Sequence, residues 1–177
     1  MDAGFRIKRD SLNLFFIMDD GADSGDILSQ TPINVSYEDD ARSLYNKIAT
    51  TAESQLEKLH DKLKCRKFTR SKQDDRQANY WRKRGEHDGV IRFNMSSTAI
   101  YNLVRALSKP YIGAHLIYDS NKVTIWKVKE MPCEVSNIEF GKILAVPDNS
   151  IDIKCYDGSI RILEHEFNTL PKVGEYI

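Results

Sequence analysis

Residues 19–28 read DDGADSGDIL, a stretch in which four carboxylates surround two glycines directly after an apolar run at 12–18. A carboxylate held in a tight loop can bind water and relay a proton, and glycines let backbone approach a flat ligand. The same composition also fits a solvated acidic turn in which Asp20, Asp23 or Asp26 caps local backbone groups. From the loop alone, the solvated turn is the favoured interpretation.

Few other kinds of chemistry are suggested by the sequence. There is no glycine-rich phosphate loop and no Ser-His-Asp set. The three cysteines, Cys65, Cys133 and Cys155, are odd in number and lack the Cys/His spacing of a zinc site. We therefore expect no metal and no disulfide framework.

Composition predicts a globular protein, and its balanced charge gives no indication of a nucleic acid or membrane partner. The chain has 177 residues, 41% of them hydrophobic, with 26 basic and 26 acidic side chains. No apolar run approaches the length of a membrane span, and no signal peptide follows Met1. These features favour a soluble, cytoplasmic protein that does not bind membranes.

The acidic stretch must be positioned by the elements around it. Residues 12–18 predict a strand covered on both faces, because polar alternation is missing. Residues 27–35 predict a second strand, which Pro32 places near an edge. Residues 36–39 have the spacing of a capping box, and apolar residues then recur at steps of three and four up to Leu63, which predicts a long amphipathic helix.

A basic stretch from Lys58 to Arg84 leads to a second unit. Within it, residues 80–84 (YWRKR) could stack bases and hold phosphates, but a junction anchor with Trp81 buried is favoured. Ser96 or Ser97 can cap a short helix, whose apolar stripe is Ile100, Leu103, Val104 and Leu107. Five short strands are expected at 114–118, 123–128, 142–146, 151–155 and 159–163, which suggests a small barrel resembling an OB-fold.

Two side chains of this second unit are expected to be structural. His115 starts a strand and is expected to be packed rather than catalytic. Tyr111 follows the short helix and is expected in the core.

Four stretches in a fixed order carry a resemblance to a known family. They are LFFIMDDGADSGDILSQ, DDARSLYNKIATTAESQL, YWRKRGEHDGVIRFNMSSTAIYNLVRALSKPYIGAH, and the pair VTIWKV and GKILAV. In this order they resemble the folate-dependent formyltransferases, which include methionyl-tRNA formyltransferase and the sugar-nucleotide N-formyltransferases. The resemblance covers roughly residues 12–177.

The resemblance implies an α+β fold in three parts. Residues 1–66 would be the C-terminal remnant of the α/β catalytic domain, with two strands plus a long helix. Residues 67–87 would be a basic linker, and residues 88–177 a C-terminal OB-like β-barrel domain.

The resemblance also gives the acidic stretch a role. Asp23 matches the family's catalytic aspartate, and the loop before it would line the pterin of the formyl donor, 10-formyltetrahydrofolate. The side chains of Asp19, Asp20 and Asp26 are expected to be structural. The backbone groups expected at the pterin belong to Met18, Asp19, Asp20, Gly21 and Ala22.

One departure from the family concerns the partners of this aspartate. In the family it works with an asparagine and a histidine on a His-Pro-Ser-Leu-Leu-Pro-like segment that precedes the loop. Here eleven residues precede Leu12, and all four histidines follow the loop. We expect a C-terminal portion of a formyltransferase that is inactive alone.

The formyl acceptor is expected to be a nucleotide-linked amino sugar. Residues 88–177 carry ten basic and eleven acidic side chains, whereas a tRNA-binding barrel should be basic. Methionyl-tRNA is the alternative acceptor, which the basic linker favours mildly. A non-catalytic binding or dimerisation module, with a possible homodimer, is the alternative of another class.

Overall fold

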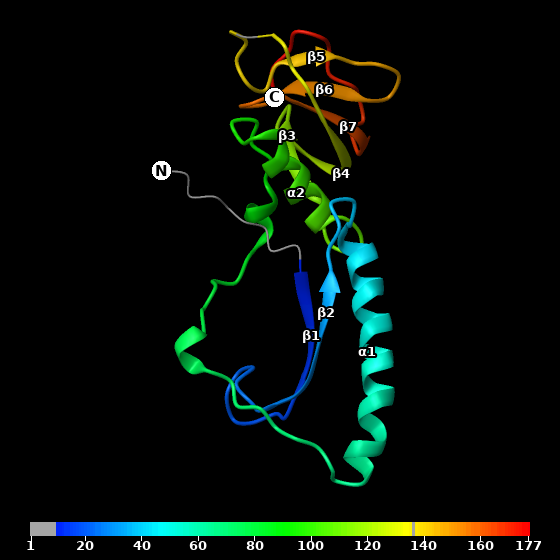
Figure 1. Ribbon diagram of the computed structural model, residues 1–177. Helices are drawn as coiled ribbons and strands as arrows, with labels where there is room; N and C mark the ends of the chain where they lie inside the picture. The colour runs from blue at the N-terminus through cyan, green and yellow to red at the C-terminus, as the bar shows by residue number, and fades with distance from the viewer. Residues whose placement is uncertain (1–9, 136) are drawn as a thin grey trace. The chain divides into compact units, whose positions relative to one another are not determined.

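The computed structural model describes residues 10–135 and 137–177, which form two compact units (Figure 1). The N-terminal unit runs to Asp39 and resumes at Ser43–Arg82; the C-terminal unit contains Asp40–Arg42 and Lys83–Ile177. Residues 1–9, where the predicted catalytic remnant begins, lie outside the described residues. The predicted domain boundaries at 66/67 and 87/88 remain predictions.

The N-terminal unit is built on a two-stranded antiparallel sheet. Strands β1 (Asp10–Phe16) and β2 (Ile27–Asn34) pair in a register that places Leu14 opposite Gln30. Both strands lie within two residues of their predicted bounds. In this unit the first strand is not covered on both faces, because Leu12 is 54% exposed.

Helix α1 (Ala41–Lys64) is joined to this sheet by a polar contact. Leu59 is buried, and so is the side chain of Gln55. Asn13 Nδ2 of β1 donates to Gln55 Oε1 at 3.0 Å, and Gln55 Nε2 donates to Ser29 Oγ of β2 at 2.6 Å. One amide therefore joins the helix to both strands. Both of its hydrogen bonds matter, because a buried polar group is stable only when its hydrogen bonds are made.

The turn before α1 is stabilised by Asp39. Its carboxylate accepts from Ser36 N at 2.7 Å, from Ser43 Oγ at 2.8 Å and from Lys47 Nζ at 2.5 Å. The Lys47 ammonium, aided by the Ser36 and Ser43 donors, holds the pKa of the Asp39 carboxyl well below its ordinary value, although burial opposes this. The predicted capping segment at 36–39 therefore lies in the turn before the helix, which itself begins at Ala41.

The C-terminal unit combines one helix with a curled, five-stranded antiparallel sheet in the order β3-β4-β7-β6-β5. Each strand predicted from the sequence is present, and the observed β4 is longer than expected. Closure of this sheet into an OB-like barrel remains a prediction. The elements are η1 (Asp75–Gln77) at the end of the N-terminal unit, then η2 (Glu86–Gly89), α2 (Ser97–Leu107), β3 (Ala114–Tyr118), β4 (Asn121–Met131), β5 (Ile143–Ala145), β6 (Ile151–Lys154) and β7 (Ser159–His165).

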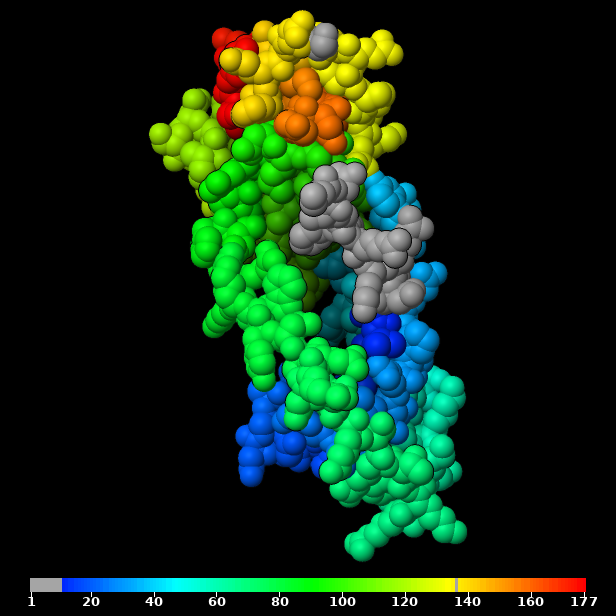
Figure 2. Space-filling model, turned by 60° about the vertical axis from the view of Figure 1, so that its left-hand side comes forward, coloured from blue at the N-terminus to red at the C-terminus, as the bar shows by residue number. Residues whose placement is uncertain are grey.

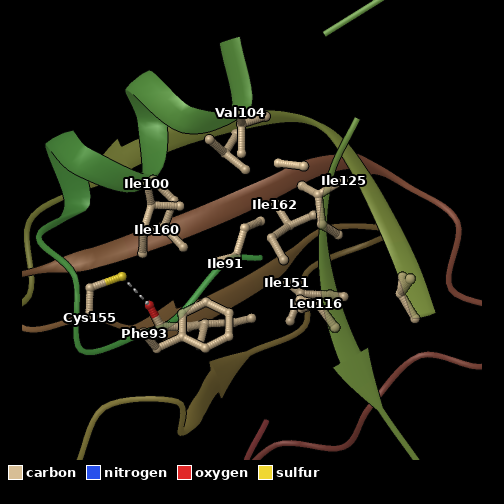
Figure 3. Close-up of a cluster of buried hydrophobic side chains, with 14 of the residues drawn as sticks. Ile91, Phe93, Ile100, Val104, Leu116, Ile125, Ile151, Cys155, Ile160 and Ile162 are labelled. Atoms are coloured by element: carbon tan, nitrogen blue, oxygen red, sulfur yellow. Dashed lines mark hydrogen bonds between the residues drawn. The ribbon is translucent and has the colours of Figure 1, made fainter. Parts of the chain in front are cut away.

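The core of this unit lies between α2 and the sheet (Figure 3). Ile100 and Val104 point from α2 toward the isoleucines of β7, and Leu103 and Leu107 pack against the same cluster. The predicted apolar stripe is therefore confirmed. Burial of each isoleucine contributes about 1.5–3 kcal/mol. The fully buried side chains include Ile100, Leu116, Ile125, Ile143, Ile151, Ile153, Ile160 and Ile162.

The two ends of α2 differ. At its start, Ser96 Oγ accepts from Ala99 N at 3.1 Å, as the sequence predicts, and Asp157 Oδ1 accepts from Ser97 N at 2.8 Å. A carboxylate here complements the positive end of the helix dipole. Beyond its last turn, Tyr111 is 58% exposed, so its predicted place in the core is wrong.

None of the helices in the described ranges combines the length and the apolar run needed to cross a bilayer.

Candidate functional site

The acidic loop, which we define as residues 17–26, joins β1 to β2 through a narrow neck. Ile17 N donates to Asp26 O at 2.9 Å. A Cβ atom placed on Gly25 would lie 1.6 Å from the carbonyl oxygen of Ile17. Glycine is therefore required at this position by close approach of the two backbones.

Inside the loop, the Asp19 carboxylate organises a turn. Asp19 Oδ1 accepts from Gly21 N at 3.1 Å and from Ser24 Oγ at 2.7 Å. This is an Asx-type turn, in which the side chain replaces a backbone acceptor. The residues considered for such a role from sequence alone were Asp20, Asp23 and Asp26; the structure gives it to Asp19.

Asp23 occupies the tip of the loop in a left-handed conformation, with φ of 58°. Its side chain is exposed, and within the described residues its carboxylate has no hydrogen bond or ion pair. The backbone N–H groups of Met18, Asp20 and Ala22 likewise have no partner in this part of the chain. The loop thus presents the carboxylates of Asp20 and Asp23 and several backbone groups outward, with Asp23 at the left-handed tip, which suits proton transfer beside a bound ligand.

A segment beyond α1 holds the loop from outside. Ser71 and Ile27 exchange two backbone hydrogen bonds, of 2.8 and 3.0 Å, and Gln73 Nε2 donates to Asp23 O at 2.8 Å and to Gly25 O at 2.7 Å. In Figure 2 the loop, in blue, and this segment, in green, lie side by side at the surface. Gln73 cannot be found from the sequence, because a single glutamine in a basic stretch has no recognisable spacing.

The aromatic and basic run at 80–84 is open to solvent. Tyr80 is 96% exposed and Trp81 is 77% exposed, with Trp81 Nε1 donating to Asn79 Oδ1 at 2.8 Å. The favoured interpretation of a junction anchor with Trp81 buried is therefore wrong within the described residues. Exposed aromatics next to cations retain the ability to stack on bases.

His115 belongs to the core of the C-terminal unit, as predicted. It is 5% exposed, and its Nδ1 atom has no hydrogen-bond partner among the described residues. Burial lowers the pKa of this imidazole, Lys122 lowers it further, and Glu86 acts in the opposite direction. Among the described residues no group of His, Cys, Asp and Glu side chains could hold a metal ion.

Comparison with known proteins identifies the family to which this chain belongs. A sequence profile described as "Formyl transferase, C-terminal domain" matches residues 84–173, about half of the chain. The chain belongs to the formyltransferase family. The resemblance of the four ordered stretches is thereby confirmed, as is the identification of the C-terminal portion.

One relative extends the match to most of the chain. The methionyl-tRNA formyltransferase of Caldanaerobacter subterraneus is 34% identical over 163 residues, which cover 91% of this chain and 52% of that protein. The chain thus spans about half the length of the relative it matches.

Two solved structures share the fold. HypX from Aquifex aeolicus, in complex with tetrahydrofolic acid, has a TM-score of 0.71 at 15% identity, covering 92% of this chain and 28% of that chain. The N-formyltransferase from Helicobacter canadensis, in complex with folinic acid and dTDP-3-aminofucose, has a TM-score of 0.65 at 19% identity, covering 89% and 56%. At these identities the likeness establishes the fold alone.

Proposed function

We propose that the chain is the C-terminal part of a 10-formyltetrahydrofolate-dependent formyltransferase, with Asp23 as its catalytic aspartate. The observation that carries the proposal is the acidic loop itself. In a member of this family, a fixed neck and a left-handed tip hold an exposed carboxylate that makes no other contact within the described residues. Such a group can serve a ligand because the fold does not use it.

The loop fits a pterin in shape and in hydrogen bonding. Gly21 and Ala22 have small side chains, so a flat ring can approach their backbone. The unpartnered N–H groups of Met18, Asp20 and Ala22 suit the ring's oxygen and nitrogen acceptors. 10-Formyltetrahydrofolate would supply the formyl group, and tetrahydrofolate would leave as the other product.

Asp23 would accept the proton that the attacking amine loses in this reaction. An amine that attacks a formyl carbon gains positive charge and must lose a proton. A carboxylate at the loop tip can accept that proton directly or through a water molecule that it orients. Acidic neighbours add negative charge around the tip, which favours a developing ammonium over a neutral amine.

For the acceptor we favour methionyl-tRNA, on the strength of the 34% identical relative, which is a methionyl-tRNA formyltransferase. The exposed Tyr80 and Trp81 are compatible with a nucleic acid. This reverses the preference for an amino sugar drawn from the sequence, because identity over most of the chain is more specific than a near-neutral net charge.

A nucleotide-linked amino sugar is the second candidate, and one observation favours it. Two cations of the C-terminal unit are engaged by carboxylates: Lys122 by Glu86, and Arg161 by Asp152 at 2.6 Å. Paired cations have less charge to offer to phosphates. A role as a binding or dimerisation module without catalysis is the remaining alternative.

Formyl transfer in the intact enzyme tests these proposals. Asp23→Asn removes the proton acceptor while keeping the size of the side chain, and we expect at least a hundredfold loss of rate with folding unchanged. Asp20→Asn is the matched control in the same loop and should retain activity. If Asp23→Asn is as active as the parent enzyme, the catalytic assignment is wrong.

The acceptor is tested by offering methionyl-tRNA and a dTDP-linked amino sugar in parallel. Neutralisation of six phosphates predicts that tRNA affinity falls roughly a thousandfold between 50 and 200 mM salt. Formylation of the amino sugar alone would establish the second candidate. Transfer to neither, in a folded enzyme supplied with 10-formyltetrahydrofolate, would favour the non-catalytic alternative.

A further inference from the structure

The acidic loop depends on a residue that lies far from it in the chain. Gln73 follows Asp23 by 50 positions and Gly25 by 48. Its side-chain amide has two N–H groups, and the single Nε2 atom lies 2.8 Å from Asp23 O and 2.7 Å from Gly25 O. Both N–H groups of this amide are therefore directed at the loop, at the carbonyl of the tip residue Asp23 and at that of Gly25, two positions later.

The backbone of the same segment sets the position of Gln73. Ser71 pairs with Ile27 at the start of β2 through two hydrogen bonds, which is a short antiparallel bridge. Side chains two positions apart in extended chain point to the same side. The bridge at Ser71 therefore fixes the place from which Gln73 reaches the loop.

The loop has few other contacts that could hold its tip in place. Asp23 adopts φ of 58°, a conformation that costs a residue with a side chain roughly 1–2 kcal/mol. The Asp19 turn fixes the first half of the loop, and the Ile17–Asp26 bond fixes its neck. The Gln73 amide is the contact that binds the carbonyl of Asp23 itself.

We propose that Gln73 is a positioning residue for formyl transfer, which holds the backbone of Asp23 so that its carboxylate faces the reacting groups. The role rests on the proposed function of Asp23. Gln73 does not touch the substrate in this proposal; it acts through the two carbonyl groups that it binds. Misplacement of a reacting group by about 1 Å can reduce a rate a hundredfold, so this contact should affect turnover.

Two substitutions at the same position separate hydrogen bonding from size. Gln73→Glu has nearly the same shape but presents an anionic acceptor to two carbonyl groups, so both bonds are lost. Gln73→Lys presents N–H donors again and should restore part of the effect. Gln77→Glu makes the same charge change four residues away, where the amide contacts only the exposed side chain of Asp74, at 3.1 Å.

Hydrogen exchange of the chain measures loop order without any need for activity. The amides of Ile17 and Ile27 close the loop, and in Gln73→Glu we expect them to exchange about tenfold faster or more, as befits the loss of one to two hydrogen bonds. Gln73→Lys should lie nearer the parent protein, and Gln77→Glu should match it. Unchanged exchange in Gln73→Glu would overturn the proposal.

Formyl transfer by the intact enzyme then tests the link to catalysis. We expect Gln73→Glu to lower kcat about tenfold to a hundredfold with little change in KM for the acceptor, and Gln73→Lys to recover part of kcat. A kcat equal to that of the parent enzyme, with Asp23→Asn inactive, would refute the positioning role alone. A different result is that Asp23→Asn is fully active while exchange is still faster in Gln73→Glu. That result would refute the proposed function of Asp23, and with it the positioning role of Gln73 in catalysis. The structural contact between Gln73 and the loop would still be supported.

Discussion

Replacement of Gly25 by alanine tests the geometry of the acidic loop most directly. The added Cβ would lie 1.6 Å from the carbonyl oxygen of Ile17, a separation less than half of a normal contact between carbon and oxygen. The obstacle is backbone, which cannot rotate away as a side chain can. The neck must therefore open by more than an ångström.

The change in the free energy of opening the neck follows from the hydrogen bonds that this movement disturbs. Three of them meet at the neck and tip: Ile17 N to Asp26 O at 2.9 Å, and Gln73 Nε2 to the carbonyls of Asp23 and Gly25. Each contributes about 0.5–1.5 kcal/mol, so opening the neck should become easier by about 2–4 kcal/mol. Since 1.4 kcal/mol is a factor of ten in an equilibrium, the open population should rise roughly thirtyfold or more.

Limited proteolysis can measure this population, because cleavage tracks the open form when opening is fast. A protease that cuts before aspartate should cleave the Gly25–Asp26 bond at least roughly thirtyfold faster in Gly25→Ala than in the parent protein. Gly21→Ala is the matched control in the same loop, since its Cβ meets mainly the Ser24 hydroxyl, at 2.1 Å, which can rotate aside. Equal cleavage rates in the two variants would refute the argument from close backbone approach.

Three further predictions concern stability and reactivity. Lys47 lowers the pKa of the Asp39 carboxyl in the folded state. The contribution of Asp39 to stability should therefore be full above the unfolded-state pKa of about 4 and should be lost as the pH falls below that value. Asp39→Asn should remove this part of the pH dependence in acid-unfolding curves. Ile100→Ala, at a position with no solvent exposure, should cost about 2–5 kcal/mol in urea unfolding, and a cost below 1 kcal/mol would contradict the described core. Burial raises the pKa of the Cys155 thiol to about 12, so iodoacetamide at pH 8 should modify the exposed Cys65 and leave Cys155 unmodified in the native state, as mass spectrometry can check.

The helices and strands of the fold could be predicted because the sequence signal of each one is distributed over many residues. Helix α2 combines a serine cap with apolar residues at steps of three and four, and each of these features survives in the structure. The strands of the C-terminal unit were found for a similar reason, as turn residues separate short apolar runs. Where a signal rests on a single aromatic residue, as at Tyr111 and Trp81, the prediction of burial was wrong.

The candidate site was only partly predictable, for a physical reason. The acidic loop is visible in the sequence because its aspartates and glycines are adjacent. Its support comes from Gln73, and a contact across 50 positions leaves no local spacing. Likewise, nothing in the sequence indicates that Asp19 rather than Asp20 or Asp23 closes the turn, since this choice depends on backbone angles that only the folded loop defines.

The contact between Asp157 and the first turn of α2 has a consequence for the order of folding. A helix of 11 residues is only marginally stable in isolation. The carboxylate that accepts the hydrogen bond from Ser97 N lies 60 positions further along the chain. During synthesis, α2 therefore leaves the ribosome well before the hairpin of β6 and β7 that completes it. At about 5–20 residues per second, the helix waits for several seconds in an unfinished state, and its apolar stripe is exposed to chaperones over that interval.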